Sequence, residues 1–229
     1  VVALTTHVEL VLDESNYVEI AQYFLANGHF EGAFRPPVYP LFVAFCQAIG
    51  GDSATPVRIG HALVSTAAGV VLYTWLRSHV GHRGALLSAS VWCLYPVFIG
   101  FTHLLWTETV FLSLLIGFIA LLFPAGPLSM RRTAAAAVVY GLASLTRSML
   151  LPFTPFAALF VLFESAAWKW RSQRWARYAL FIAVVGATVF PWSLHNRVVE
   201  GTWVVNETTH GYNLWKGNTP WSHPHAETG

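Results

Sequence analysis

The stretch LWTETVFLSLLIGFIALLF, residues 105–123, decides the fold class. Apart from Glu108 near its start it carries no charge, and its length matches the roughly 20 apolar residues that a helix needs to cross a bilayer. Five further runs share this character: 56–76, 84–101, 133–146, 148–166 and 178–194. We therefore expect an all-α membrane protein, a multi-span transmembrane helical bundle with about six spanning helices in residues 56–194.

The composition agrees with that expectation. The chain has 229 residues, of which 55% are hydrophobic and only 10% are charged, against about 25% charged residues in soluble domains. Its mean hydropathy is +0.52. These values exclude a disordered chain, a nucleic-acid-binding arm and an ordinary soluble enzyme. Cys46 and Cys93 both lie in apolar runs and offer neither a disulfide framework nor metal-ligand spacing, and we predict no metal site and no cofactor.

Basic residues predict how the chain is oriented in the membrane. Eight of the thirteen lysines and arginines fall in three alternate loops: Arg77, Arg83, Arg131, Arg132, Lys169, Arg171, Arg174 and Arg177. The positive-inside rule places these loops in the cytoplasm. The opposite, outer face then carries residues 13–55, the turn at 103–107, the turn at Arg147 and the tail. We expect a plasma or inner membrane protein whose site faces the periplasm or the extracellular side.

The outer segments are the longest polar parts of the chain. Residues 1–12 are interpreted as the end of a first span, and 13–55 as the first outer loop. Apolar residues spaced by three and four from Tyr17 to Leu25, ahead of Asn27-Gly28, predict an amphipathic helix lying in the interface plane. Residues 38–49 are too short to span and are interpreted as re-entrant or interfacial. The tail, 195–229, includes a glycosylation sequon at 206–208.

Two features of the first outer loop carry candidate chemistry. Asp13 and Glu14 open its helix. Asp13 is interpreted as an N-cap or as a carboxylate held at the membrane boundary to accept a proton, and the two interpretations are compatible. Arg35 precedes Pro36-Pro37, which fix an extended backbone. Its guanidinium either rests on lipid headgroups or pairs with the phosphate of a bound lipid.

Two charged residues at the ends of apolar runs are further candidates. Glu108 is either a first-turn acid with Thr107 as its cap, or a functional acid of the kind that is rare within spans. Arg147, between two apolar runs, either extends to headgroups or faces a site. The close pairs His79/His82 and His223/His225 have no acid or cysteine partners and are interpreted as solvated loop residues.

Taken in order, several short motifs resemble one family. The chain is similar to the integral-membrane glycosyltransferases of the GT-C fold, and most of all to the bacterial aminoarabinose transferase and protein O-mannosyltransferase group. The motifs are Asp13-Glu14 with Tyr17 and Ala21, Arg35-Pro36-Pro37 with Tyr39-Pro40, Tyr95-Pro96 with Thr107-Glu108, Gly141-Leu142-Ala143 with Thr146-Arg147, Pro191-Trp192 with Asn196-Arg197, and Gly211-Tyr212-Asn213-Leu214-Trp215 with Gly217-Asn218.

The resemblance implies transfer of a sugar from a polyprenyl-phosphate carrier to a lipid, glycan or protein acceptor at the outer face. We expect this transfer to invert the anomeric carbon, because the phosphate would leave from the side opposite the acceptor. In such enzymes an acid of the first outer loop is the general base, and Asp13 stands at that position. Arg35 matches the basic residue that contacts the carrier phosphate, and Tyr17 contributes to the same phosphate site. Glu108 matches a second acid of the catalytic site. Glu14 and Arg147 are possible site-lining residues.

The chain also departs from the family pattern. Asn16 stands where the aminoarabinose transferases carry a basic residue, and Phe34 where they carry an acid, so the resemblance argues against aminoarabinose as the sugar. Family members have well over twice as many spans before a C-terminal outer domain. We therefore expect this chain to be a fragment of a longer protein.

Two other classes of protein remain as alternatives. A transporter or flippase would carry charged groups deep within its spans. A non-catalytic membrane subunit would have no cavity shared by Asp13, Arg35 and Glu108. The chain has no basic patch for nucleic acid.

Overall fold

The computed structural model describes residues 12–164, 171–209, 215 and 218. All regular structure in these residues is helical, which confirms the predicted all-α class. The elements are α1 (Leu12–Asn27), α2 (Val38–Gly50), α3 (Ala54–Leu94), α4 (Pro96–His103), α5 (Glu108–Leu122), α6 (Met130–Ser144), the 3₁₀ helix η2 (Ser148–Phe153), α7 (Thr154–Glu164) and α8 (Arg171–Glu200).

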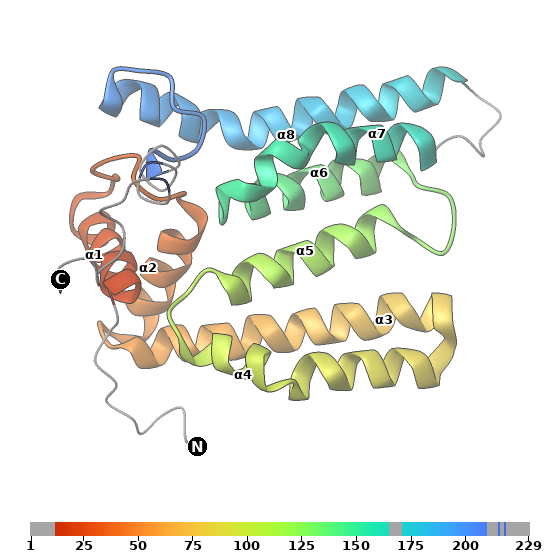
Figure 1. Cartoon of the computed structure of the whole chain (residues 1–229), viewed down its shortest axis with the longest axis horizontal. Helices are drawn as coiled ribbons and strands as arrows, with labels where there is room; N and C mark the ends of the chain where they lie inside the picture. The colour runs from red at the N-terminus through yellow and green to blue at the C-terminus, as the bar shows by residue number, and fades with distance from the viewer. Residues whose placement is uncertain (1–11, 165–170, 210–214, 216–217, 219–229) are drawn as a thin grey trace.

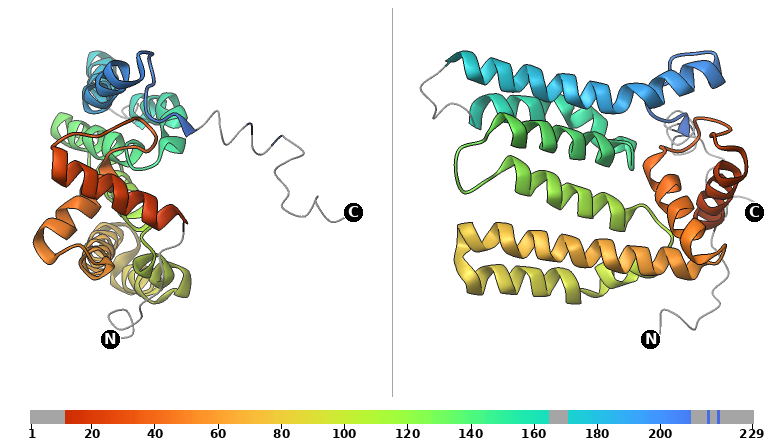
Figure 2. Two further views of the ribbon diagram at one scale, coloured as in Figure 1. Left: turned by 90° about the vertical axis from the view of Figure 1, so that its left-hand side faces the viewer. Right: turned by 180° about the vertical axis from the view of Figure 1, so that it is seen from behind.

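Most of the helices form a bundle, in which α3, α5, α6, α7 and α8 run side by side, and α1 and α2 lie across one end of it (Figure 1). In the left view of Figure 2 this end faces the viewer, and α1 crosses the ends of the bundle helices. The turn within α3 and the loop between α5 and α6 lie at the opposite end. The two ends of the bundle therefore differ in structure, and only one carries extra helices.

Helix α1 contains the segment predicted to be an amphipathic helix. It ends at Asn27, where Gly28 adopts a positive φ of 74° and its N–H bonds to the carbonyl of Phe24 at 2.8 Å. A positive φ is free of strain only in glycine, so the predicted end is confirmed. The helix begins at Leu12, and Asp13 therefore lies in its first turn and is not its N-cap. From this position its carboxylate still interacts favourably with the positive end of the helix dipole.

The predicted span 84–101 is wrong as one helix. Helix α3 turns sharply at Gly81 (φ 76°, ψ 176°) and returns as far as Leu94. Tyr95 is then extended (ψ 123°), and α4 starts at Pro96. The residue before a proline is sterically excluded from the helical region, and proline has no N–H to continue the ladder. The apolar run hides this break, because both sides of it are equally hydrophobic.

Several other predicted spans have different limits in the structure. The run 148–166 starts as the 3₁₀ helix η2, which contains Pro152, before α7 begins. The segment 38–49, interpreted above as re-entrant or interfacial, makes up all but the last residue of the 13-residue helix α2. Among the residues that the structure describes, two helices are long and apolar enough to cross a membrane: Ala54–Leu94, which turns at Gly81, and Gln173–Glu200. The remaining apolar helices are shorter, so six spans remain a prediction.

Two buried clusters hold the helices together. Tyr17, Tyr39 and Leu105 belong to the first, which fastens α1 and α2 to α3 and to the start of α5. The second lies between α5, α6, α7 and α8, around Tyr140 and Phe181. Large apolar side chains also cover the outside of the bundle, where an aqueous surface would carry charges. Such a surface is suited to lipid, which solvates apolar side chains.

Candidate active site

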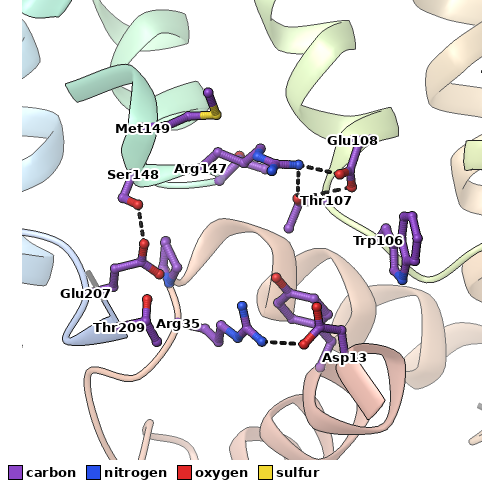
Figure 3. Close-up of a pocket in the computed structure, with 13 residues that line it drawn as sticks. Asp13, Arg35, Trp106, Thr107, Glu108, Arg147, Ser148, Met149, Glu207 and Thr209 are labelled. Carbon is purple, nitrogen blue, oxygen red and sulfur yellow. Dashed lines mark hydrogen bonds and ion pairs between the residues drawn. The ribbon is translucent and has the colours of Figure 1, made fainter. Parts of the chain in front are cut away.

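A cavity of about 360 Å³ opens at the end of the bundle where α1 lies (Figure 3). Five separate parts of the chain contribute to it: α1, the loop before α2, the start of α5, the junction of α6 and η2, and the tail after α8. It brings together five of the six predicted site residues. Its lining consists of Asp13, Tyr17, Arg35, Pro36, Trp106, Thr107, Glu108, Thr146, Arg147, Ser148, Met149, Glu207 and Thr209.

Arg35 is held by two side chains of α1. Its Nη2 donates to Asp13 Oδ1 at 2.7 Å, and its Nε donates to Asn16 Oδ1 at 3.2 Å. Residues three apart lie on the same face of a helix, so Asp13 and Asn16 together present two acceptors to one planar guanidinium. Asn16, at the position where a basic residue was expected from the family pattern, thus orients the cation that is present.

The ring of Tyr17 lies beneath this guanidinium. The Cζ atom of Arg35 is 5.1 Å from the centroid of the ring, within cation–π range. Tyr17 is 7% exposed, and the edge-to-face contact of its ring with Tyr39 fixes the ring. Burial raises the pKa of the Tyr17 phenol, although nearby Arg35 acts in the opposite direction. The phenol therefore stays protonated at neutral pH and can donate a hydrogen bond.

A second acid–arginine pair forms another wall of the cavity. Thr107 precedes the first residue of α5, Glu108, and Nη1 of Arg147 donates both to Glu108 Oε1 and, at 3.3 Å, to Thr107 Oγ1. The Thr107 hydroxyl makes no capping bond to the helix backbone and instead donates to Glu108 Oε2 at 3.4 Å. Arg147 therefore faces the cavity and does not simply extend to lipid headgroups.

The chain around Arg147 is fixed by hydrogen bonds to α6. Its N–H bonds to the carbonyl of Ala143 in the last turn of α6 at 3.0 Å, after which the backbone is extended (φ −139°, ψ 115°). The hydroxyl of Tyr140 donates to the carbonyl of Leu150 at 2.8 Å and so ties η2 back to α6. Arg147 is thus presented from a short, braced junction between two helices.

The tail after α8 folds back to complete the cavity. Asn196, which is fully buried in α8, donates to the carbonyls of Val204 and Asn206 at 3.0 and 3.2 Å. Ser193 donates to the carbonyl of Val205 at 2.7 Å. Asn206 itself donates to the carbonyl of Ser144 at 2.7 Å, at the end of α6. These bonds bring Glu207 to the cavity, where its carboxylate accepts a hydrogen bond from Ser148.

Glu14 is the predicted residue that the structure places elsewhere. Its side chain is 2% exposed and does not line the cavity, and its Oε1 accepts a hydrogen bond from the N–H of Leu105 at 2.7 Å. Consecutive helical residues point about 100° apart, so when Asp13 faces the cavity its neighbour faces the segment before α5. Glu14 is therefore a structural link between α1 and that segment.

Sequence reasoning missed Glu207, Ser148 and Thr209 as lining residues. Glu207 lies within the predicted glycosylation sequon, which gave no indication of a cavity. Ser148 and Thr209 are each 5% exposed. The only sequence signals for a role at the site are that Ser148 follows Arg147 and that Thr209 lies in the outer tail. In the part of the chain that the structure describes, no group of three or more histidine, cysteine, aspartate or glutamate side chains is arranged to hold a metal ion.

The arrangement suits an anionic group carried by a lipid. Two arginines lie in one cavity, each with an acid beside it, at the end of a helical bundle with an apolar outer surface. Arginine can offer two parallel N–H groups to phosphate oxygens. A phosphate can displace the acids from these arginines, and a released carboxylate can then accept a proton.

Comparison with known proteins identifies the class. The model of the family described as dolichyl-phosphate-mannose-protein mannosyltransferase matches residues 34–192. That match takes in more than half of the sequence, and the chain therefore belongs to this family of glycosyltransferases. The family resemblance expected from the sequence motifs is confirmed. No curated protein gave a significant match.

Two crystal structures of ArnT from Cupriavidus metallidurans share the fold. The apo form has a TM-score of 0.68 and 20% identity, and the alignment covers 86% of this chain and 39% of ArnT. For the form bound to undecaprenyl phosphate the TM-score is 0.71, the identity 19%, and the coverage 88% and 40%. At this identity the likeness shows the GT-C fold alone. The chain spans about two fifths of the length of these solved structures.

Proposed function

We propose that the protein transfers a sugar from a polyprenyl-phosphate carrier to a lipid, glycan or protein acceptor at the outer face of a membrane, with inversion at the anomeric carbon. The observation that carries the proposal is the shared cavity, which is lined by Asp13 and Arg35, in contact with one another, and by Glu108. Family membership supplies the reaction class. The bound lipid of one ArnT structure, undecaprenyl phosphate, supplies the chemistry of the carrier.

The arginines are assigned to the leaving group. A sugar linked to a polyprenyl phosphate has one negative charge on its phosphodiester, and a second charge develops on the phosphate as the bond from the anomeric carbon breaks. Arg35 donates to that phosphate, with the neutral phenol of Tyr17 as a further donor. Arg147 approaches from the second wall of the cavity. Donors that are aimed in advance at developing charge lower the barrier most.

Asp13 is assigned the role of general base. As the acceptor oxygen or nitrogen forms its bond to the anomeric carbon, its proton passes to the Asp13 carboxylate and the phosphate departs from the opposite side. Asp13 forms an ion pair with Arg35. A phosphate that takes over Arg35 releases the carboxylate, so binding of the donor activates the base. Glu108, paired with Arg147, is the second acid of the site.

The difference between the two ends of the bundle supports the proposed orientation in the membrane. The cavity lies at the α1 end, while the turn of α3, flanked by Arg77 and Arg83, and the loop that leads to Arg131 and Arg132 lie at the other. Cationic loops favour the cytoplasm. The cavity then opens to the periplasmic or extracellular side of a plasma or inner membrane, with α1 lying in the interface plane.

The two alternatives fit the site less well. A transporter would place charges deep within its helices, whereas Asp13, Glu108 and Arg147 all lie at the ends of helices. A non-catalytic subunit would have no reason to gather two acid–arginine pairs in one cavity.

The proposal is tested by assaying transfer in the full-length protein. We expect Asp13→Asn to lower turnover by roughly 10²–10⁴-fold, the usual contribution of a general base. Its matched control is Asp52→Asn, which changes an exposed acid of the turn between α2 and α3. Near-wild-type turnover in Asp13→Asn would exclude the assigned base.

A further inference from the structure

The cavity has a third carboxylate that the proposed chemistry does not use. Glu207 reaches it from the tail, at a corner formed with Ser148 and Thr209, and Arg35 extends between this corner and Asp13 (Figure 3). The corner offers one carboxylate and two hydroxyl groups, and the Ser148 hydroxyl donates to the Glu207 carboxylate.

The corner is a built feature and not a loose end of chain. Trp192, Ser193 and Asn196, from consecutive turns of α8, all donate to backbone carbonyls of residues 204–206. On the other side of Glu207, the N–H of Thr208 bonds to the carbonyl of Ala33 at 3.0 Å. The segment that carries Glu207 is therefore held on both sides of that residue. A preorganised carboxylate is the kind of group that fixes a ligand in one orientation.

We propose that Glu207, Ser148 and Thr209 form a subsite for the hydroxyl groups of a sugar. A carboxylate accepts hydrogen bonds from hydroxyls and repels a phosphate, while the serine and threonine hydroxyls can both donate and accept. Phosphate therefore belongs with the arginines and a neutral polyol with this corner. The inference rests on the proposed function and deepens it, because it assigns where a sugar is recognised.

Two sources can supply that polyol, the sugar of the donor or an acceptor glycan. The experiment measures binding to the full-length protein in lipid nanodiscs, with three probes: bare undecaprenyl phosphate, undecaprenyl phosphate carrying one of a panel of hexoses, and the corresponding methyl glycosides added to protein saturated with the bare lipid. Glu207→Gln keeps an acceptor for the Ser148 hydroxyl but removes the charge. Glu19→Gln is the matched control, because Glu19 is an exposed acid of α1 that lines a neighbouring cavity and not this one.

We expect Glu207→Gln to leave binding of the bare lipid unchanged and to weaken binding of a hexose by roughly 10- to 100-fold, the range for hydrogen bonds to a charged group. A loss confined to the hexose-bearing lipid identifies the donor sugar, and a loss confined to the methyl glycoside identifies an acceptor glycan. Ser148→Ala should weaken the same probe to a smaller extent.

The result that overturns the inference is wild-type hexose binding in Glu207→Gln, or a wild-type protein that binds the bare lipid and no hexose. A wild-type protein that does not bind bare undecaprenyl phosphate contradicts the proposed function itself, and the inference falls with it. Thermal unfolding of each variant distinguishes lost binding from a displaced tail, since a folded Glu207→Gln protein with an unchanged midpoint keeps its tail in place.

Discussion

Arg35 donates from Nη2 to Oδ1 of Asp13 at 2.7 Å, so the side chain assigned to the carrier phosphate is also the partner of the side chain assigned as base. Asp13 is well exposed, its side chain being 65% accessible, whereas that of Arg35 is 20% accessible. An ion pair so open to water contributes little to stability. Its importance lies in exchange, because a phosphate competes with Asp13 for the same guanidinium.

The first prediction concerns that exchange. Arg35→Gln should lower turnover by roughly 10²–10³-fold, the effect of removing one donor aimed at developing charge. Arg35→Lys should retain more turnover than Arg35→Gln but less than the wild type. Lysine keeps the positive charge but lacks the planar guanidinium that contacts Asp13 and Asn16. The control is Arg83→Gln, an exposed cation at the other end of the bundle. Equal turnover in the Arg35 and Arg83 variants would contradict the phosphate assignment.

The second prediction concerns the pair formed by Glu108 and Arg147. The two side chains are 24% and 34% accessible and contact one another, so their substitutions should be coupled. In a double-mutant cycle of Glu108→Gln and Arg147→Gln, the loss of turnover in the double variant should be smaller than the product of the two single losses. Additive effects on log turnover would show that the two residues act separately.

The third prediction follows from the buried phenol. Burial raises the pKa of Tyr17 above its ordinary value of about 10, so the folded protein holds this proton more tightly than the unfolded chain. The resulting stabilisation is complete below about pH 10 and is lost as pH rises through the folded-state pKa. Thermal midpoints measured on both sides of about pH 10 should fall more in the wild type than in Tyr17→Phe. An equal fall of the thermal midpoint at alkaline pH in both proteins would contradict a raised pKa of Tyr17.

Local signals in the sequence predicted much of the α1 end. Asn27-Gly28 predicted the end of α1, because glycine readily adopts a positive φ after the last turn of a helix, as Gly28 does with a φ of 74°. Local sequence does not indicate which of Asp13 and Glu14 faces the cavity. Neighbouring helical residues differ in the direction of their side chains, and the direction that meets the cavity depends on the rest of the fold. The segment that binds Glu14, at Leu105, lies 91 residues away.

Other parts of the fold could not be predicted from local pattern. The break at Tyr95-Pro96 is a steric effect of one proline, which a long apolar run conceals. Glu207 reaches the cavity only because the tail folds back, and its contact with Ser148 joins residues 59 apart in sequence. Hydropathy indicates which segments avoid water, but it does not indicate which polar residues outside them will meet.

The fourth prediction tests how the tail is held. Asn196 is fully buried and bonds to two carbonyls of the tail. Asn196→Ala removes both bonds, and only the Asn206 carbonyl keeps a second donor, Trp192 Nε1. We expect a loss of about 1–3 kcal/mol of stability and weaker donor binding, because Glu207 leaves the cavity with its segment. Asn27→Ala is the control, since the single side-chain bond of Asn27 is exposed at the end of α1. Matching losses of stability in the two variants would contradict the tail contact.

The fifth prediction concerns the packing of α6 against α8, which positions both Arg147 and the tail. A Cβ atom at Gly141 would lie 2.7 Å from Cβ of Thr188, whereas one at Gly186 would meet nothing within 4 Å. Gly141→Ala should therefore force the two helices apart and cost about 1–3 kcal/mol, the usual effect of overpacking. Gly186→Ala in α8 should be neutral or slightly stabilising, because alanine favours the helix. Thermal unfolding measures both, and an equally stable Gly141→Ala protein would show that the helices do not approach so closely.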